Sequence, residues 1–251
     1  MVPHREIFWN VPYGWTVYAL AYVAVVALVY GVRRHLRLWL LGRPVQVDRI
    51  PQRLLTLLRD SLLHLRFLRE PYPGIMHGLI FWGFLVLLLG TGLDAADHYL
   101  GLGLLRGGGY LVFSFVLDLA GLAATVGVLM ALYRRYVQRP ERLESGLDDA
   151  VSLLWILAIL VSGFLVEGAR IAAELPPFER WSFVGWATAR LLGPGLSGLH
   201  RALWWAHALL ALGFVGWLPH GKLLHVLVGP ANQFLRSTQP KGVLPPILDF
   251  E

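Results

Sequence analysis

Four histidines lie in or beside stretches that are apolar enough to enter a membrane: His77, His98, His207 and His225. An imidazole buried in hydrocarbon is costly unless it has a partner or a task. Haem iron provides both, because imidazole is a standard axial ligand of haem. The chain contains no cysteine, so it cannot form a disulfide, a thiolate metal site or a cysteine-ligated iron–sulfur cluster. Helices that carry histidine but no cysteine are typical of a b-type haem site.

The spacing of these histidines predicts how they would pair. His207 and His225 are 18 residues apart, which is five whole turns of an α-helix. On one continuous helix they would share a face and lie about 27 Å apart along the axis. His77 is expected at the membrane depth of His225, so these two are predicted to ligate one haem iron. The partner of His207 is less clear from spacing: a second haem would use His207 with either His98 or His200, and His98 is preferred because His200 shares a helix with His207. A histidine that only bonds a neighbouring helix is the alternative for each.

The elements that must position these residues are long apolar helices. The chain of 251 residues is 56% hydrophobic and 15% charged, whereas soluble domains carry about 25% charged residues. The charges are clustered, and the stretches between them are long enough to cross a bilayer. We therefore expect an all-α integral membrane protein, a five-helix haem-binding bundle that forms a single domain over 1–251. The expected spans are 11–32, 75–93, 110–133, 150–168 and 199–228.

An amphipathic segment and the basic residues predict the orientation. Residues 51–69 have leucines on one side and arginines elsewhere, which is typical of a helix lying on the membrane face. Of the 22 Lys and Arg, 16 fall in 33–71, 134–148 and 222–251, and loops rich in positive charge face the cytoplasm. The N-terminus is then outside, and the tail, 229–251, is cytoplasmic. Because these loops account for the net charge of +6, no nucleic-acid partner is expected.

Several stretches resemble a known family. The sequence PGIMHGLIFWGF at 73–84 is similar to the second helix of nitrate reductase gamma-subunit-like cytochromes b. The segment 207–230 resembles the fifth helix of that family, including the 18-residue interval between histidines. The motifs at 134–140, 162–170 and 242–247 resemble the branch that accompanies heterodisulfide-reductase-like iron–sulfur proteins. That branch includes members of the electron transfer flavoprotein:menaquinone oxidoreductase type.

The resemblance implies the membrane subunit of a quinone-linked oxidoreductase in the cytoplasmic membrane. Such a subunit carries electrons through haem b between a cytoplasmic iron–sulfur partner, with electron transfer flavoprotein beyond it, and menaquinone. The resemblance assigns His77 and His225 to the iron of the cytoplasmic-side haem and His207 to a second haem. The family's fourth ligand position is Leu87 here, so one haem is expected and a second requires His98. The iron–sulfur partner would be a separate polypeptide or the rest of a longer product.

Ionisable residues inside the spans are candidates for quinone chemistry. Asp118 lies eight residues into a span, and Glu167 and Arg170 lie at the end of another. Quinone reduction consumes protons, so a carboxyl group beside the quinone could relay them. The alternatives are an ion pair between Glu167 and Arg170, three residues apart, and a buried hydrogen bond from Asp118. Lys222, one turn from His225, is predicted to contact a haem propionate, with lipid phosphate as its alternative partner.

Two other functions remain as alternatives. A haem-free anchor would only dock a cytoplasmic redox enzyme, and an ion or proton transporter would use Asp118 and Glu167 on its path. Transporters often contain inverted repeats and broken helices, and no internal repeat is found in this sequence. An absorption spectrum separates the haem protein from both alternatives. In the leading hypothesis, the segments 51–69 and 229–251 form the docking surface for the iron–sulfur partner.

Overall fold

The structure is a computed structural model that describes residues 2–4, 6–42, 47–63, 67–195 and 197–236. Within these residues the regular structure is helical, apart from one isolated bridge between His4 and Arg106. Five helices are long and apolar enough to cross a membrane: Gly14–Trp39, Pro71–Leu100, Gly108–Gln138, Leu147–Ile171 and Gly198–His220. The prediction of an all-α membrane protein with five spans is confirmed. The last part of the predicted tail, 237–251, lies outside the described residues.

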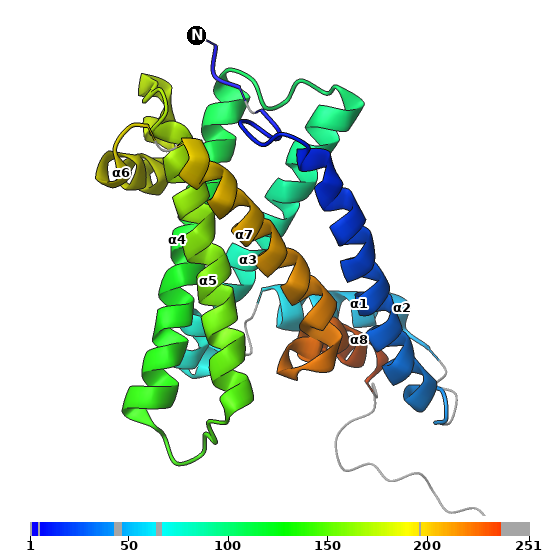
Figure 1. Cartoon of the computed structure of the whole chain (residues 1–251). Coiled ribbons are helices and arrows are strands. Elements are labelled where there is room, and N and C mark those ends of the chain that lie inside the picture. The colour runs from blue at the N-terminus through cyan, green and yellow to red at the C-terminus, as the bar shows by residue number, and fades with distance from the viewer. Residues whose placement is uncertain (1, 5, 43–46, 64–66, 196, 237–251) are drawn as a thin grey trace, which may run out of the picture.

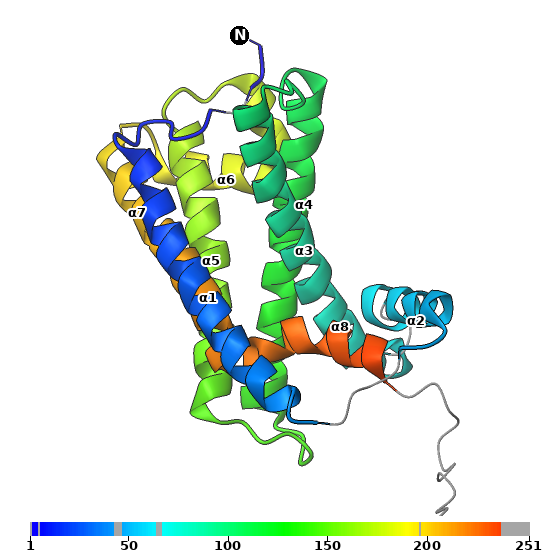
Figure 2. The same cartoon turned by 90° about the vertical axis from the view of Figure 1, so that its right-hand side faces the viewer.

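The helices fall into two sets. The long ones are α1 (Val17–Trp39), α3 (Pro71–Leu100), α4 (Gly108–Tyr133), α5 (Leu147–Ile171) and α7 (Ser197–Trp217). The short ones are α2 (Ile50–Leu57), α6 (Phe183–Leu192) and α8 (His225–Leu235). Figures 1 and 2 show α6 across the end of the bundle that holds the N-terminus, with α2 and α8 across the other end. We call these ends the N-terminal face and the α2–α8 face. That the α2–α8 face is cytoplasmic stays a prediction.

Glycines let α3 and α4 approach closely. A Cβ added to Gly83 would lie 2.7 Å from the Ala120 carbonyl oxygen, and one added to Gly127 would lie 2.8 Å from Ile80 Cγ1. Both distances are below van der Waals contact, so a larger side chain would force the helices apart. In the described part of the chain, α3 makes no extended contact with α1, α7 or α8. Figure 2 accordingly shows α3 and α4 on one side of the bundle and α1 and α7 on the other.

The span predicted at 199–228 is two helices rather than one. α7 ends at Trp217, and α8 begins only after two 3-10 turns over 218–224. Pro219 has no N–H with which to continue the helix, and Gly221 is extended, with φ −122° and ψ −172°. A Cβ on Gly221 would lie 2.5 Å from the Trp217 ring, so the turn requires glycine at this position.

The break overturns one sequence-based argument. His207 and His225 were predicted to share a face because 18 residues make five turns, and that argument required one continuous helix. Instead, His207 lies in α7 and His225 is the first residue of α8. The two side chains therefore belong to helices with different axes, as Figure 2 shows. The axial separation of about 27 Å does not apply to them.

The amphipathic segment predicted at 51–69 is helical over most of its described length. α2 continues as a π-helical turn over Leu58–Leu62, and a 3-10 turn covers Phe67–Arg69. Residues 64–66 lie outside the described part of the chain. α2 packs against α8, so the two short helices form one unit at the α2–α8 face.

Candidate functional site

His225 presents one ring nitrogen for ligation. Its Nδ1 lies 2.8 Å from the backbone oxygen of Lys222. Because a carbonyl oxygen only accepts, Nδ1 carries the proton and Nε2 keeps its lone pair. No described residue hydrogen-bonds this Nε2, and the side chain is exposed. A backbone carbonyl that holds Nδ1–H is the usual way in which proteins orient a metal-binding imidazole.

His77 lies to one side of the face of α3 that contacts α4. Ile80 and Gly83 belong to that face, and they are rotated by about 60° and 120° from His77 around the helix. The His77 ring stacks on Phe81 with a centroid separation of 6.4 Å. Cβ atoms added to Gly78 and Gly92 would meet nothing within 4 Å. The glycines of this helix are therefore of two kinds: some let α4 approach, and others, such as Gly78 and Gly92, have no described atom beside them.

These features suit a haem held by two histidines. His77 and His225 come from helices that make no extended contact in the described residues, and both carry a nitrogen donor suited to iron. Gly78, next to His77, adds no side chain at that position, and a Cβ there would meet nothing within 4 Å. Among the described residues, no group of three or more His, Asp or Glu could hold a metal ion. A haem needs only two axial ligands from the protein.

His207 is oriented by a serine of the neighbouring helix. Its Nδ1 lies 3.0 Å from Ser162 Oγ, and that hydroxyl donates its own proton to the backbone oxygen of Ile159 at 3.0 Å. The imidazole must therefore donate through Nδ1–H, which leaves its Nε2 as an acceptor. A Cβ on Gly163 would lie 3.3 Å from the His207 ring, so a side chain at this position of α5 would crowd the imidazole.

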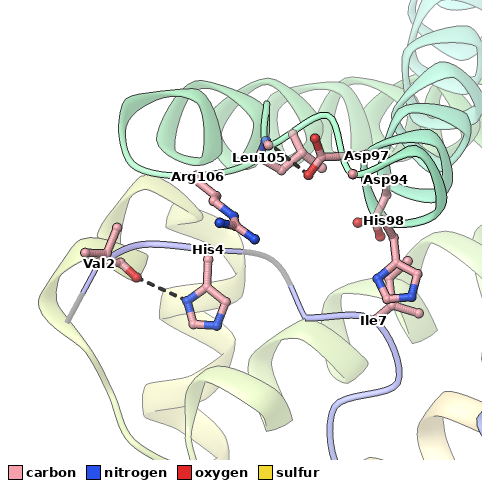
Figure 3. Close-up of a pocket in the computed structure, with 10 residues that line it drawn as sticks. Val2, His4, Ile7, Asp94, Asp97, His98, Leu105 and Arg106 are labelled. Atoms are coloured by element: carbon pink, nitrogen blue, oxygen red, sulfur yellow. Dashed lines mark hydrogen bonds between the residues drawn. The ribbon is translucent and has the colours of Figure 1, made fainter.

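The structure does not bring together the residues predicted for a second haem. His98 is exposed and lines a pocket of about 420 Å³ at the N-terminal face. Figure 3 shows His98 and Asp94, both from α3, turned toward the N-terminal segment. His207 instead meets α5 through Ser162. Leu87, at the family's usual ligand position, packs against the buried core of α4 and α5.

The three residues predicted for quinone and proton chemistry lie together at the N-terminal face. Asp118 Oδ2 accepts hydrogen bonds from the backbone N–H groups of Val184 at 2.6 Å and Gly185 at 3.3 Å. It thereby caps the start of α6. Glu167 lies beside Asp118 and 3.8 Å from Arg170.

Two members of this network were missed by sequence reasoning. Glu179 is 2% exposed, and its Oε1 accepts hydrogen bonds from Arg170 at 2.7 Å and from the Tyr110 hydroxyl at 2.8 Å. Glu179 lies in the connection before α6, where no periodicity places a side chain. The spacing of three residues predicted only the contact between Glu167 and Arg170. The sequence does not indicate that Glu179 is buried, because this burial arises from the tertiary fold.

Lys222 binds a carboxylate of the protein, and its contact with a haem propionate stays a prediction. Its Nζ donates a hydrogen bond to Asp149 Oδ2 at 2.7 Å, and Arg135 Nη1 lies 3.3 Å from the same oxygen. The predicted propionate contact would have to compete with this carboxylate. The Lys222 side chain is half exposed, at 55%.

The predicted docking segments are joined by a buried arginine. Arg53 of α2 is 5% exposed and donates hydrogen bonds to the backbone oxygens of Phe234 at 2.7 Å and Arg236 at 2.6 Å. It also donates to the Asp48 carboxylate at 2.7 Å, which lowers the pKa of that carboxyl group. A cation that binds the last carbonyls of α8 complements the helix dipole. The described part of the tail is therefore fixed to α2.

The fold defines a multi-pass membrane protein with histidines in α3, α7 and α8. The chain belongs to the nitrate reductase gamma subunit family, whose model matches residues 78–241. This confirms the resemblance found in the sequence. The match begins directly after His77 and includes His207 and His225.

Two curated relatives cover nearly all of this chain. It is 35% identical to "EtfAB:quinone oxidoreductase" of Syntrophomonas wolfei, over 96% of this chain and 36% of the relative. It is 28% identical to "Probable iron-sulfur-binding oxidoreductase FadF" of Bacillus subtilis, over 90% of this chain and 33% of the relative. The chain thus spans about a third of the length of each relative. No solved structure matches it.

Proposed function

We propose that this chain is the haem b membrane subunit of an oxidoreductase and carries electrons between an iron–sulfur partner and menaquinone. Membership of the nitrate reductase gamma subunit family supports a role in membrane electron transfer. The names of the two relatives support a quinone as the substrate and an iron–sulfur protein as the partner. They also support electron transfer flavoprotein as the source of the electrons that reach the iron–sulfur partner. The complex would lie in the cell membrane with the α2–α8 face toward the cytoplasm.

The observation that carries the proposal is the orientation of His225. Its Nδ1–H is held by the Lys222 carbonyl, so its Nε2 is directed as an iron ligand. His77 supplies the second ligand from α3. The haem, when bound, would supply a one-electron carrier between partner and quinone. The protein supplies the two ligands and the tautomer of His225, and Gly78 adds no side chain beside His77.

The network at the N-terminal face is proposed to exchange protons with the quinone. Two backbone N–H groups at the start of α6 hold the Asp118 carboxyl group in place. Either carboxyl group, that of Asp118 or that of Glu167, could give a proton to a quinone or accept one from a quinol. Arg170, held by Glu179, keeps a positive charge beside Glu167.

The proposal assigns one haem to each chain. His207 has its tautomer set by Ser162 in the same way as His225 has by Lys222. A second haem would therefore use His207 Nε2, and it would need another ligand at that depth. Pyridine haemochrome stoichiometry of the purified protein decides the number. Two haems per chain would overturn the assignment of one, and a His98→Ala variant that kept both would exclude His98.

The test of the function is an absorption spectrum of the purified chain and its variants. Wild-type protein should show the α-band of reduced b-type haem. His77→Ala and His225→Ala should each abolish it, whereas His220→Ala, an exposed neighbour, should retain it. A full haem complement in either ligand variant would show that the pairing is wrong. A wild-type spectrum without haem would favour the haem-free anchor or the transporter.

A further inference from the structure

Asp149 joins three parts of the chain at the α2–α8 face. It is the third residue of α5, and its side chain is 7% exposed. Its Oδ2 accepts a hydrogen bond from the backbone N–H of Gly146 at 3.0 Å and another from Lys222 Nζ at 2.7 Å. Arg135, from the turn that follows α4, lies 3.3 Å from the same oxygen. One carboxylate oxygen thus holds the end of α4, the start of α5 and the turn before α8.

This carboxylate acts on His225 through a single residue. Asp149 binds the side chain of Lys222, and the backbone oxygen of Lys222 accepts the proton of His225 Nδ1. The turn at 218–224 is not part of a regular helix, so the helical hydrogen-bond pattern does not fix its position. Side-chain anchors must therefore do so, and the Lys222–Leu224 turn packs against α5.

We propose that Asp149 is a positioning residue for His225 and sets the electrostatic environment of the haem that His225 would hold. The inference rests on the proposed function. Asp149 fixes Lys222, and the Lys222 carbonyl fixes the tautomer and orientation of the His225 ring. Its negative charge also offsets one of the two cations, Arg135 and Lys222, that contact it. The Lys222 ammonium group is thereby held in an ion pair with Asp149.

The charges predict opposite effects of two substitutions. Reduction of ferric haem lowers its charge by one, so positive neighbours favour the reduced form. Asp149→Asn leaves Arg135 and Lys222 uncompensated and should favour reduced haem by about tenfold, or 59 mV for a one-electron couple. Lys222→Gln removes a cation and should favour oxidised haem. Damage to the fold alone would shift the midpoint potentials of both variants in the same direction, because both variants lose the ion pair between Asp149 and Lys222.

The experiment is a redox titration of the haem-loaded chain, with the low-spin electron paramagnetic resonance signal recorded in parallel. Asp149→Asn should raise the midpoint potential, Lys222→Gln should lower it, and both should shift the resonance signal. Asp148→Asn, an exposed neighbour on the same turn, is the matched control and should change neither. If Asp149→Asn fails to accumulate, Lys222→Gln still tests the proposal, because its midpoint potential is expected to fall.

The experiment distinguishes a failure of this inference from a failure of the proposed function. Haem-loaded variants with the potential and resonance signal of the wild type would overturn the role of Asp149 and leave the proposed function intact. Shifts of the same sign in both variants would also overturn it. Wild-type protein without haem would overturn the proposed function and, with it, this inference.

Discussion

Replacing Asp118 with alanine tests the N-terminal face directly. Asp118 Oδ2 accepts the backbone N–H groups of Val184 and Gly185, and both lose their acceptor in Asp118→Ala. A buried donor without a partner costs about 1–3 kcal/mol, and loss of a helix cap costs about 1 kcal/mol. The two costs describe the same two hydrogen bonds, so they are not added. The bond from Gly185 is long, at 3.3 Å, and counts for less than the 2.6 Å bond from Val184, so we expect the free energy of unfolding to fall by about 2–4 kcal/mol.

The assay is thermal unfolding of the purified protein, followed by circular dichroism. At about 2–4 °C per kcal/mol for a chain of this size, the midpoint should fall by about 4–16 °C. Glu174→Ala removes an exposed carboxylate near the same face and should leave the midpoint unchanged. Asp118→Asn keeps one acceptor and should lose less stability, while its turnover with a quinone should fall because an amide cannot release and take up a proton as a carboxyl group does. An Asp118→Ala variant with the wild-type midpoint would refute the capping role.

Three further predictions concern the helix contacts. Gly83→Ala places a Cβ 2.7 Å from Ala120 and should lower the free energy of unfolding by about 1–3 kcal/mol, whereas Gly78→Ala meets nothing and should not destabilise the chain in the same thermal assay. Arg53→Met removes the donor to two carbonyls of the tail, so hydrogen exchange in α8 should accelerate by about tenfold; unchanged exchange would contradict the anchor. Because Arg53 holds the pKa of Asp48 below its ordinary value of 3.8, the contact is complete above that pH and weakens as pH falls through the lowered pKa. Exchange in α8 should rise in that acid range, and a flat profile would contradict this linkage.

The spans were predictable because a bilayer requires long apolar runs. Their ends were less so, and α3 shows the reason. The sequence placed the end of this span at residue 93, before Asp94 and Asp97, but α3 continues to Leu100. Asp97 is compatible with the helix because its carboxylate accepts the backbone N–H groups of the loop that follows, including that of Leu104 at 2.5 Å. A charge marks where the apolar run stops, and a helix can continue beyond it.

The break after α7 was not predictable from periodicity. An interval of 18 residues fits a continuous helix, and Pro219 alone can be tolerated as a kink. The decisive contacts are tertiary. Pro219 lies so close to Gly31 of α1 that a Cβ there would be 2.4 Å from it, and Gly221 lies against the Trp217 ring. The local sequence shows the proline and the glycine, but it does not show that α1 packs against them.

The proton network shows the same limit. Glu167 and Arg170 were paired from their spacing, and their contact is present at 3.8 Å. Tyr110 and Glu179 are 69 residues apart and meet only because α4 and the connection before α6 fold together. No helical or strand spacing relates such residues. A sequence therefore predicts contacts within a helix, whereas the members that complete a site come from the packing of helices.

The break also changes how a ligand at His225 must be held. A histidine within a span is fixed by the helix on both sides, whereas His225 begins a helix of 11 residues that lies across the bundle. That helix is anchored at its start through Lys222 and Asp149 and beyond its end through Arg53. Along α8, these anchors are about 16 Å apart at 1.5 Å per residue. Any partner that binds the α2–α8 face would therefore contact the same short helix whose first residue is the proposed iron ligand.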